Sequence, residues 1–157
     1  MSAFEARPPY RSYAAILGLY AARLARAGAL SRALDRDPQC QTALDLGVLG
    51  LATFKVARTL SRDSVASFVR EPFVRGDARS GDEEPARTGG FDEAIGELVT
   101  CTRCVGTSAA AALASTQIVA PRFGRLLTWS LGAAAANDFL QAGFAALTTK
   151  ANELETG

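Results

Sequence analysis

Apolar residues recur at helical spacing near the start of the chain. Between Arg11 and Leu34 they return every three or four residues, while arginines occupy the other side. This spacing predicts an amphipathic helix, which lies on a membrane surface or packs in a soluble bundle. The segment DRDPQ over 35–39 contains Pro38 and ends this helix.

A second helix is predicted from Thr42 to about Leu60. Its uncharged run, LGVLGLATF over 46–54, is shorter than the ~20 apolar residues that a membrane span requires. This helix can therefore cross a membrane only if the side chains of Lys55 and Arg58 extend to the lipid headgroups.

The chain then becomes polar, with proline, glycine and mixed charge between Ser61 and Gly90. This composition predicts a loop that is partly disordered. An amphipathic helix is predicted after it, from Phe91 to Val99, with apolar residues on one side and carboxylates on the other.

Two long apolar stretches complete the pattern. The residues from Cys104 to Ala120 carry no charge, and the stretch over 126–149 is interrupted only by Asn137, Asp138 and Gln141. The connection between them, PRFGR, is short, so the two helices are predicted to be antiparallel neighbours. Alanine supplies most of their apolar character, which suits both membrane helices and tight contacts in a soluble protein.

These elements predict an all-α fold, a small helical membrane protein with about three short transmembrane helices plus an N-terminal amphipathic helix. We divide the chain into an amphipathic segment (1–40), a helical membrane domain (41–150) with a polar loop at about 61–90, and a short tail (151–157). The expected location is a bacterial cytoplasmic membrane. A soluble helical bundle that oligomerises through its alanine-rich faces is the alternative.

Composition excludes several classes of function. The net charge is +1 and the basic residues are dispersed along the 157-residue chain, so no nucleic acid partner is expected. The chain contains no histidine, which removes the usual general base and zinc ligand and argues against an enzyme. We therefore expect a non-enzymatic scaffold or assembly partner, in contact with membrane lipid and with a protein partner or a second copy of itself.

The pair Cys101 and Cys104 is the sharpest chemical feature. Spaced i, i+3 at a helix start beside Arg103, these thiols face the same way, and the helix dipole favours a thiolate. One interpretation is that the pair performs thiol redox chemistry or forms part of a metal site. The other is that the cysteines serve only as small residues at a helix entrance. A four-thiolate metal site would need a second chain, because the only remaining cysteine, Cys40, is distant. No cofactor is expected beyond such an intermolecular metal.

Charges within the apolar stretches form a second candidate cluster. Asp138 sits in the middle of the last predicted helix, where a carboxylate needs a partner or a role. Lys55 and Arg58 are its candidate partners, and Glu97 competes for them. The cluster either holds helices in register or lines a path for protons or ions.

The stretch RDSVASFVREPF over 62–73 is a third candidate. It predicts a short helix capped by Asp63 and ended by Pro72. We interpret it as an interfacial segment that meets lipid phosphates, with Asp63, Arg70 and Phe73 as its candidate residues. A plain loop helix is the alternative.

Three stretches together resemble a known family. ATFKVARTLSRDSVASFVREPF (52–73), GELVTCTRCVG (96–106) and NDFLQ (137–141) are similar, in order and spacing, to the bacterial membrane-protein family catalogued as domain of unknown function 1360. The resemblance covers roughly residues 44–147.

The resemblance implies a small integral membrane protein with about three helices and no established activity. Similar sequences often have a proline after the first cysteine, whereas this chain has Thr102. The family pattern falls on Thr53, Lys55, Arg58, Asp63, Arg70, Pro72, Phe73, Glu97, Leu98, Cys101, Cys104, Gly106, Asp138 and Phe139.

Overall fold

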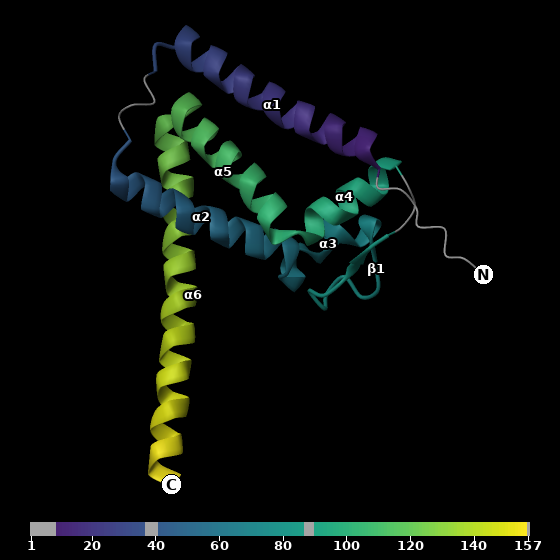
Figure 1. Cartoon of the computed structure of the whole chain (residues 1–157). Coiled ribbons are helices and arrows are strands. Elements are labelled where there is room, and N and C mark those ends of the chain that lie inside the picture. Colours follow the sequence, from purple (N-terminus) through teal and green to yellow (C-terminus); the bar gives the residue numbers. More distant parts are fainter. Residues whose placement is uncertain (1–8, 37–40, 87–89, 157) are drawn as a thin grey trace, which may run out of the picture.

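The structure is a computed structural model that describes residues 9–36, 41–86 and 90–156. The described part is almost entirely helical, which confirms the all-α prediction (Figure 1). A two-stranded antiparallel sheet pairs Val74 with Pro85 and Arg75 with Glu84. The elements are α1 (Tyr10–Ala33), α2 (Ala43–Ser61), η2 (Ser64–Ala66), α3 (Ser67–Arg70), η3 (Glu71–Phe73), β1 (Val74–Arg75), β2 (Glu84–Pro85), α4 (Gly90–Thr100), α5 (Thr102–Val119) and α6 (Pro121–Thr156).

The predicted membrane helices are not found. Within the described ranges, no helix combines the length and the apolar character needed to cross a membrane. Charged residues interrupt α2 and α6, and α5 owes its apolarity mainly to alanine, which is only weakly hydrophobic. The prediction of a small helical membrane protein with about three transmembrane helices is therefore wrong for these residues.

Helices α2, α5 and α6 form the core. Ala52 of α2 and Ala135 of α6 are completely buried, and these small side chains let the helix backbones approach closely. Gly132 of α6 lies against Val48 of α2, where an added Cβ would come within 3.0 Å of Val48 Cγ1. The C-terminal half of α6 leaves this core and extends away from the other helices (Figure 1).

Local sequence signals fix the ends of the core helices. Thr42 and Asp45 form a capping box at the start of α2, with each side chain accepting a hydrogen bond from the other residue's backbone N–H. The corner between α5 and α6 is tighter than the predicted PRFGR turn, because α6 already begins at Pro121. Gly124 permits this corner, since a Cβ there would lie 2.5 Å from the Gln117 backbone nitrogen.

The polar segment is ordered from 61 to 86, whereas its composition predicts a partly disordered loop. It winds through η2, α3, η3 and the two strands around the guanidinium of Arg70. Arg70 is completely buried and donates hydrogen bonds to the carbonyls of Leu60, Asp63 and Ala78 and to the Glu83 carboxylate.

Helix α1 confirms the helix predicted at the start of the chain and packs on α4 and α5. Two contacts hold its ends. Near its start, the Tyr13 hydroxyl donates to Glu97 of α4, and just beyond its end the Arg36 guanidinium donates to the Val119 carbonyl of α5.

Candidate thiol site and adjoining grooves

The two cysteines at the entrance of α5 contact each other. Cys101 is the N-cap of α5, and its Sγ accepts a hydrogen bond of 3.3 Å from the backbone N–H of Cys104. The Cys104 thiol also donates to Cys101 Sγ, with 2.7 Å between the sulfur atoms. Both are free thiols, Cys101 half-buried and Cys104 exposed, so one sulfur receives two donors at the positive end of a helix.

Packing of α5 on α2 fixes this pair in place. The hydroxyls of Thr102 and the buried Ser61 lie 2.9 Å apart and join the first turn of α5 to the last turn of α2. One turn later Val105 is buried, and Gly106 packs against Ala57 of α2. The thiol pair therefore stands on a rigid helix crossing.

The surroundings push the pKa values of the two thiols apart. The hydrogen bond from the Cys104 thiol lowers the pKa of Cys101, with smaller contributions from the Cys104 and Arg103 backbone N–H groups and the Arg103 charge. Burial raises the pKa of Cys104 to about 11, and its hydrogen bond to Cys101 and the charge of Glu97 act in the same direction. Cys101 is thus the thiol that ionises first.

An apolar groove of about 500 Å³ opens beside the pair, between α1, α4 and α5. We call it the thiol groove. Cys104 and Glu97 contribute two of its polar groups, and the rest is mainly aromatic and aliphatic. Its lining consists of Tyr13, Ile16, Leu17, Tyr20, Ala94, Glu97, Leu98, Cys104, Thr107 and Ser108.

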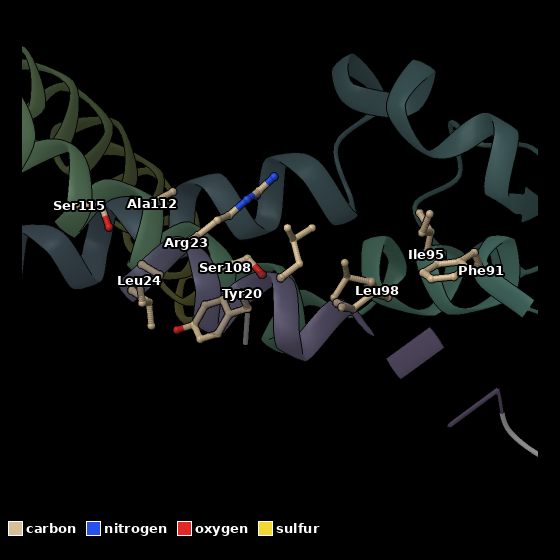
Figure 2. Close-up of a pocket in the computed structure, with 12 residues that line it drawn as sticks. Tyr20, Arg23, Leu24, Phe91, Ile95, Leu98, Ser108, Ala112 and Ser115 are labelled. Atoms are coloured by element: carbon tan, nitrogen blue, oxygen red, sulfur yellow. The ribbon is translucent and has the colours of Figure 1, made fainter. Parts of the chain in front are cut away.

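A second groove of about 500 Å³ continues along α1 and shares part of this lining. Figure 2 shows the side chains around it: Phe91 and Ile95 of α4 gather near Leu98, and Leu24 of α1 lies toward the other end with Ser115. Together the two grooves give the thiol pair an extended, mostly apolar neighbourhood.

Glu97 and Tyr13 close one side of the thiol groove. The hydrogen bond that the Tyr13 hydroxyl donates to the Glu97 carboxylate is the main cause that raises the pKa of Tyr13 to about 12. No local signal in the sequence points to Tyr13. It lies 84 positions from Glu97, so only the packing of α1 on α4 brings the two together.

The predicted charge cluster is only partly assembled. Lys55 Nζ and Asp138 Oδ2 lie 2.7 Å apart across α2 and α6, and Arg58 lines the same small cavity. Glu97 lies elsewhere, against Tyr13. The rings of Phe54 and Phe139 stack beside the ion pair, with centroids 5.1 Å apart.

The three candidate interfacial residues occupy different environments. Asp63 precedes η2 but makes no capping hydrogen bond, and its carboxylate accepts one of 2.9 Å from Thr59. Arg70 is buried with Glu83. Phe73 is half-buried, and its carbonyl accepts from Ala86 and lies against Gly96, where a Cβ would come within 2.5 Å.

A metal site would need ligands that these residues do not supply. Among the described residues, no three histidine, cysteine, aspartate or glutamate side chains gather closely enough to hold a metal ion. Cys101 and Cys104 could provide two thiolates of a four-ligand site. Cys40 lies outside the described residues.

Comparison with known proteins places the chain in a family. The family model described as Protein of unknown function (DUF1360) matches residues 48–144, which is more than half of the chain. The chain belongs to this family. The match includes the thiol pair, the buried Arg70 and the Lys55–Asp138 pair, and excludes α1. No curated protein and no solved structure is a match for this chain.

Proposed function

We propose that the protein takes part in thiol-disulfide exchange through Cys101 and Cys104, with a disulfide in a protein or peptide as its substrate. The observation that carries this proposal is the contact of 2.7 Å between the two sulfur atoms at the start of α5. Two thiols in contact can form an internal disulfide after one of them has reacted, because the second sulfur is already within reach of the first.

The lowered pKa of Cys101 supports its role as the attacking group. Its thiolate attacks one sulfur of the substrate disulfide, a bond from Cys101 to that sulfur forms, and the other substrate sulfur leaves as a thiolate with the bonding electron pair. The lower pKa increases the fraction of thiolate at neutral pH.

The raised pKa of Cys104 supports a second, resolving role. After losing its proton, Cys104 attacks Cys101 Sγ, and the remaining substrate thiolate leaves. The substrate has then gained two electrons, and the protein holds a Cys101–Cys104 disulfide that an external dithiol reduces again. The Glu97 carboxylate lines the same groove and is our candidate acceptor for the Cys104 proton.

The thiol groove supports a peptide substrate with apolar residues beside its cysteine. The lining side chains of Ile16, Leu17 and Leu98 match aliphatic side chains, and Tyr20 offers an aromatic surface. The expectation of a non-enzymatic scaffold stays a prediction. A measured exchange activity would contradict it. A metal at the pair stays the other alternative.

Trapping the mixed disulfide tests the exchange proposal. In a Cys40→Ser background, Cys104→Ser should form a stable adduct with a peptide disulfide through Cys101, because the resolving thiol is gone. The matched variant Cys101→Ser should form far less adduct, because the pKa of Cys104 is raised to about 11. Intact-protein mass spectrometry measures both, and equal trapping by the two variants would contradict the assigned roles.

The pH dependence of alkylation gives a second readout. Cys101 should react with iodoacetamide at a lower pH than an ordinary thiol, for which the pKa is about 8.5. Cys104→Ala should move that profile upward, because it removes the donor to Cys101, whereas Cys104→Ser keeps a hydroxyl donor and should move it less. Identical profiles for the wild-type chain and both variants would show that the contact does not activate Cys101.

A further inference from the structure

The outer face of α6 carries a repeating pattern that the described fold does not use. Along this face, positions separated alternately by four and three residues are all exposed. This spacing is that of the a and d positions of a heptad repeat, which form the contact between helices in a coiled coil. We call this row the α6 seam: Leu126, Ser130, Ala133, Asn137, Leu140, Phe144, Leu147, Ala151 and Leu154.

The α6 seam lies apart from the face by which α6 joins the core. The core face uses Thr128, Gly132 and Ala135, which are buried, and α6 packs there on α2 and α5. Beyond Asp138, α6 extends away from the other helices (Figure 1), and every residue from 139 to 154 is exposed. Most of the stability of a protein helix comes from the packing of its apolar face, so contacts from outside the chain would stabilise this exposed stretch.

The apolar area of the seam is enough for a dimer. Leu126, Leu140, Phe144, Leu147 and Leu154 are 67%, 73%, 70%, 72% and 76% exposed. Together these side chains offer on the order of 600 Å² per copy, close to the roughly 800 Å² per partner of a standard interface. Smaller seam residues and flanking positions add to this area.

The character of the seam favours a second copy of the same chain. A heptad face is self-complementary, because the a and d side chains of one helix fit the spaces between those of an identical helix. In a parallel pair, Asn137 occupies an a position and meets its own counterpart, an arrangement that fixes register and favours two strands. We propose that two copies of the protein associate through a parallel coiled coil along the α6 seam.

Sedimentation equilibrium on the full chain tests this interface. The wild-type chain should be dimeric at micromolar concentration. The double variant Leu140→Glu with Leu147→Glu should weaken association by roughly a hundredfold or more, since both changes place charge at the centre of the contact. Leu140 and Leu147 are 73% and 72% exposed, so circular dichroism should show that the variant keeps most of its helix content.

The matched control places the same charges on the opposite face. Ala146→Glu with Thr149→Glu adds two carboxylates to exposed positions of the same helical stretch and should leave the dimer intact. Equal dissociation of both double variants would overturn the seam as the interface. A wild-type chain that is monomeric at every concentration would overturn the proposal altogether, and would leave this face to a different partner.

A third variant tests the parallel register. Asn137→Leu should strengthen association and produce species larger than dimers, because the polar residue that selects two strands is gone. Unchanged dimers of unchanged affinity would contradict the pairing of Asn137 with its counterpart.

Discussion

The polar segment of residues 61–86 and the C-terminal half of α6 show opposite relations between composition and burial. The polar segment is rich in charge, yet it encloses a completely buried arginine. The C-terminal half of α6 is rich in leucine, phenylalanine and alanine, yet all its side chains from 139 to 154 are exposed. In these two regions, local composition does not determine what is buried.

The partners available to a side chain decide whether it is buried. Arg70 is buried because its two terminal nitrogens donate to the carbonyls of Leu60, Asp63 and Ala78 and to the Glu83 carboxylate, which is itself only 1% exposed. Its Nε–H has no hydrogen-bond partner in the described structure, so no interaction offsets the free energy of removing this group from water. The leucine and phenylalanine side chains of the α6 seam are 67% to 76% exposed, because no element of the described chain covers them.

Removing the guanidinium should break the polar segment and have the largest effect. Arg70→Met should lower the free energy of unfolding by about 3–5 kcal/mol, because it leaves the buried Glu83 carboxylate without its partner. Arg70→Lys should also be destabilising, since a single ammonium cannot reach carbonyls on both sides as a planar guanidinium does. Urea denaturation measures both.

The exposed pair of Arg62 and Asp82 provides the control for that comparison. Its side chains are 47% and 91% exposed, so Asp82→Asn should change the free energy of unfolding by less than about 1 kcal/mol. Comparable losses of unfolding free energy from Arg70→Met and Asp82→Asn would show that burial does not make the Arg70–Glu83 pair more important for stability.

The titration of Glu83 should make the stability of the polar segment depend on pH. Burial raises the pKa of Glu83, but hydrogen bonds from its own backbone N–H and from Arg70 outweigh it, so the pKa lies below its usual range. A depressed folded-state pKa stabilises the fold fully above the unfolded-state pKa of about 4.3. This contribution is lost as the pH falls from there through the folded-state pKa.

Glu83→Gln should therefore lower the stability at neutral pH and flatten its acid dependence. Asp45→Asn is the matched comparison, because its pKa is also lowered, by the capping hydrogen bonds from Thr42, but its side chain lies at a helix end and not against a buried cation. Unfolding followed at several acidic pH values measures both. An unchanged slope in Glu83→Gln would show that Glu83 does not cause the acid dependence.

The sequence predicts the helices better than it predicts their surroundings. The periodicity near Ile16, the capping residue Thr42 and the cysteine at the start of α5 are local signals, and the structure places helix ends close to them. The buried pair of Arg70 and Glu83 is not visible in the sequence, because many charged residues near it stay exposed and nothing local distinguishes the two that pair.

The candidate thiol site was also only partly predictable. The spacing of Cys101 and Cys104 predicts that the thiols face the same way, and the contact between them follows from helix geometry. The thiol groove needs α1, which brings Tyr13 against Glu97 from far away in the chain. The membrane prediction failed because an uncharged alanine-rich helix satisfies the length rule without being sufficiently apolar.

The pair of Lys55 and Asp138 lies between the two regions and should give a much smaller effect than the buried pair of Arg70 and Glu83. Its side chains are 25% and 39% exposed, so solvent weakens the attraction, and Asp138→Asn should lower the free energy of unfolding by about 1 kcal/mol or less. Lys55→Met should cost a similar amount, because the alkyl part keeps its packing. A double-mutant cycle in urea separates the pair from its neighbours. A coupling energy as large as that between Arg70 and Glu83 would contradict this prediction. It would show that water is excluded from the Lys55–Asp138 pair, as it is from the buried pair of the polar segment.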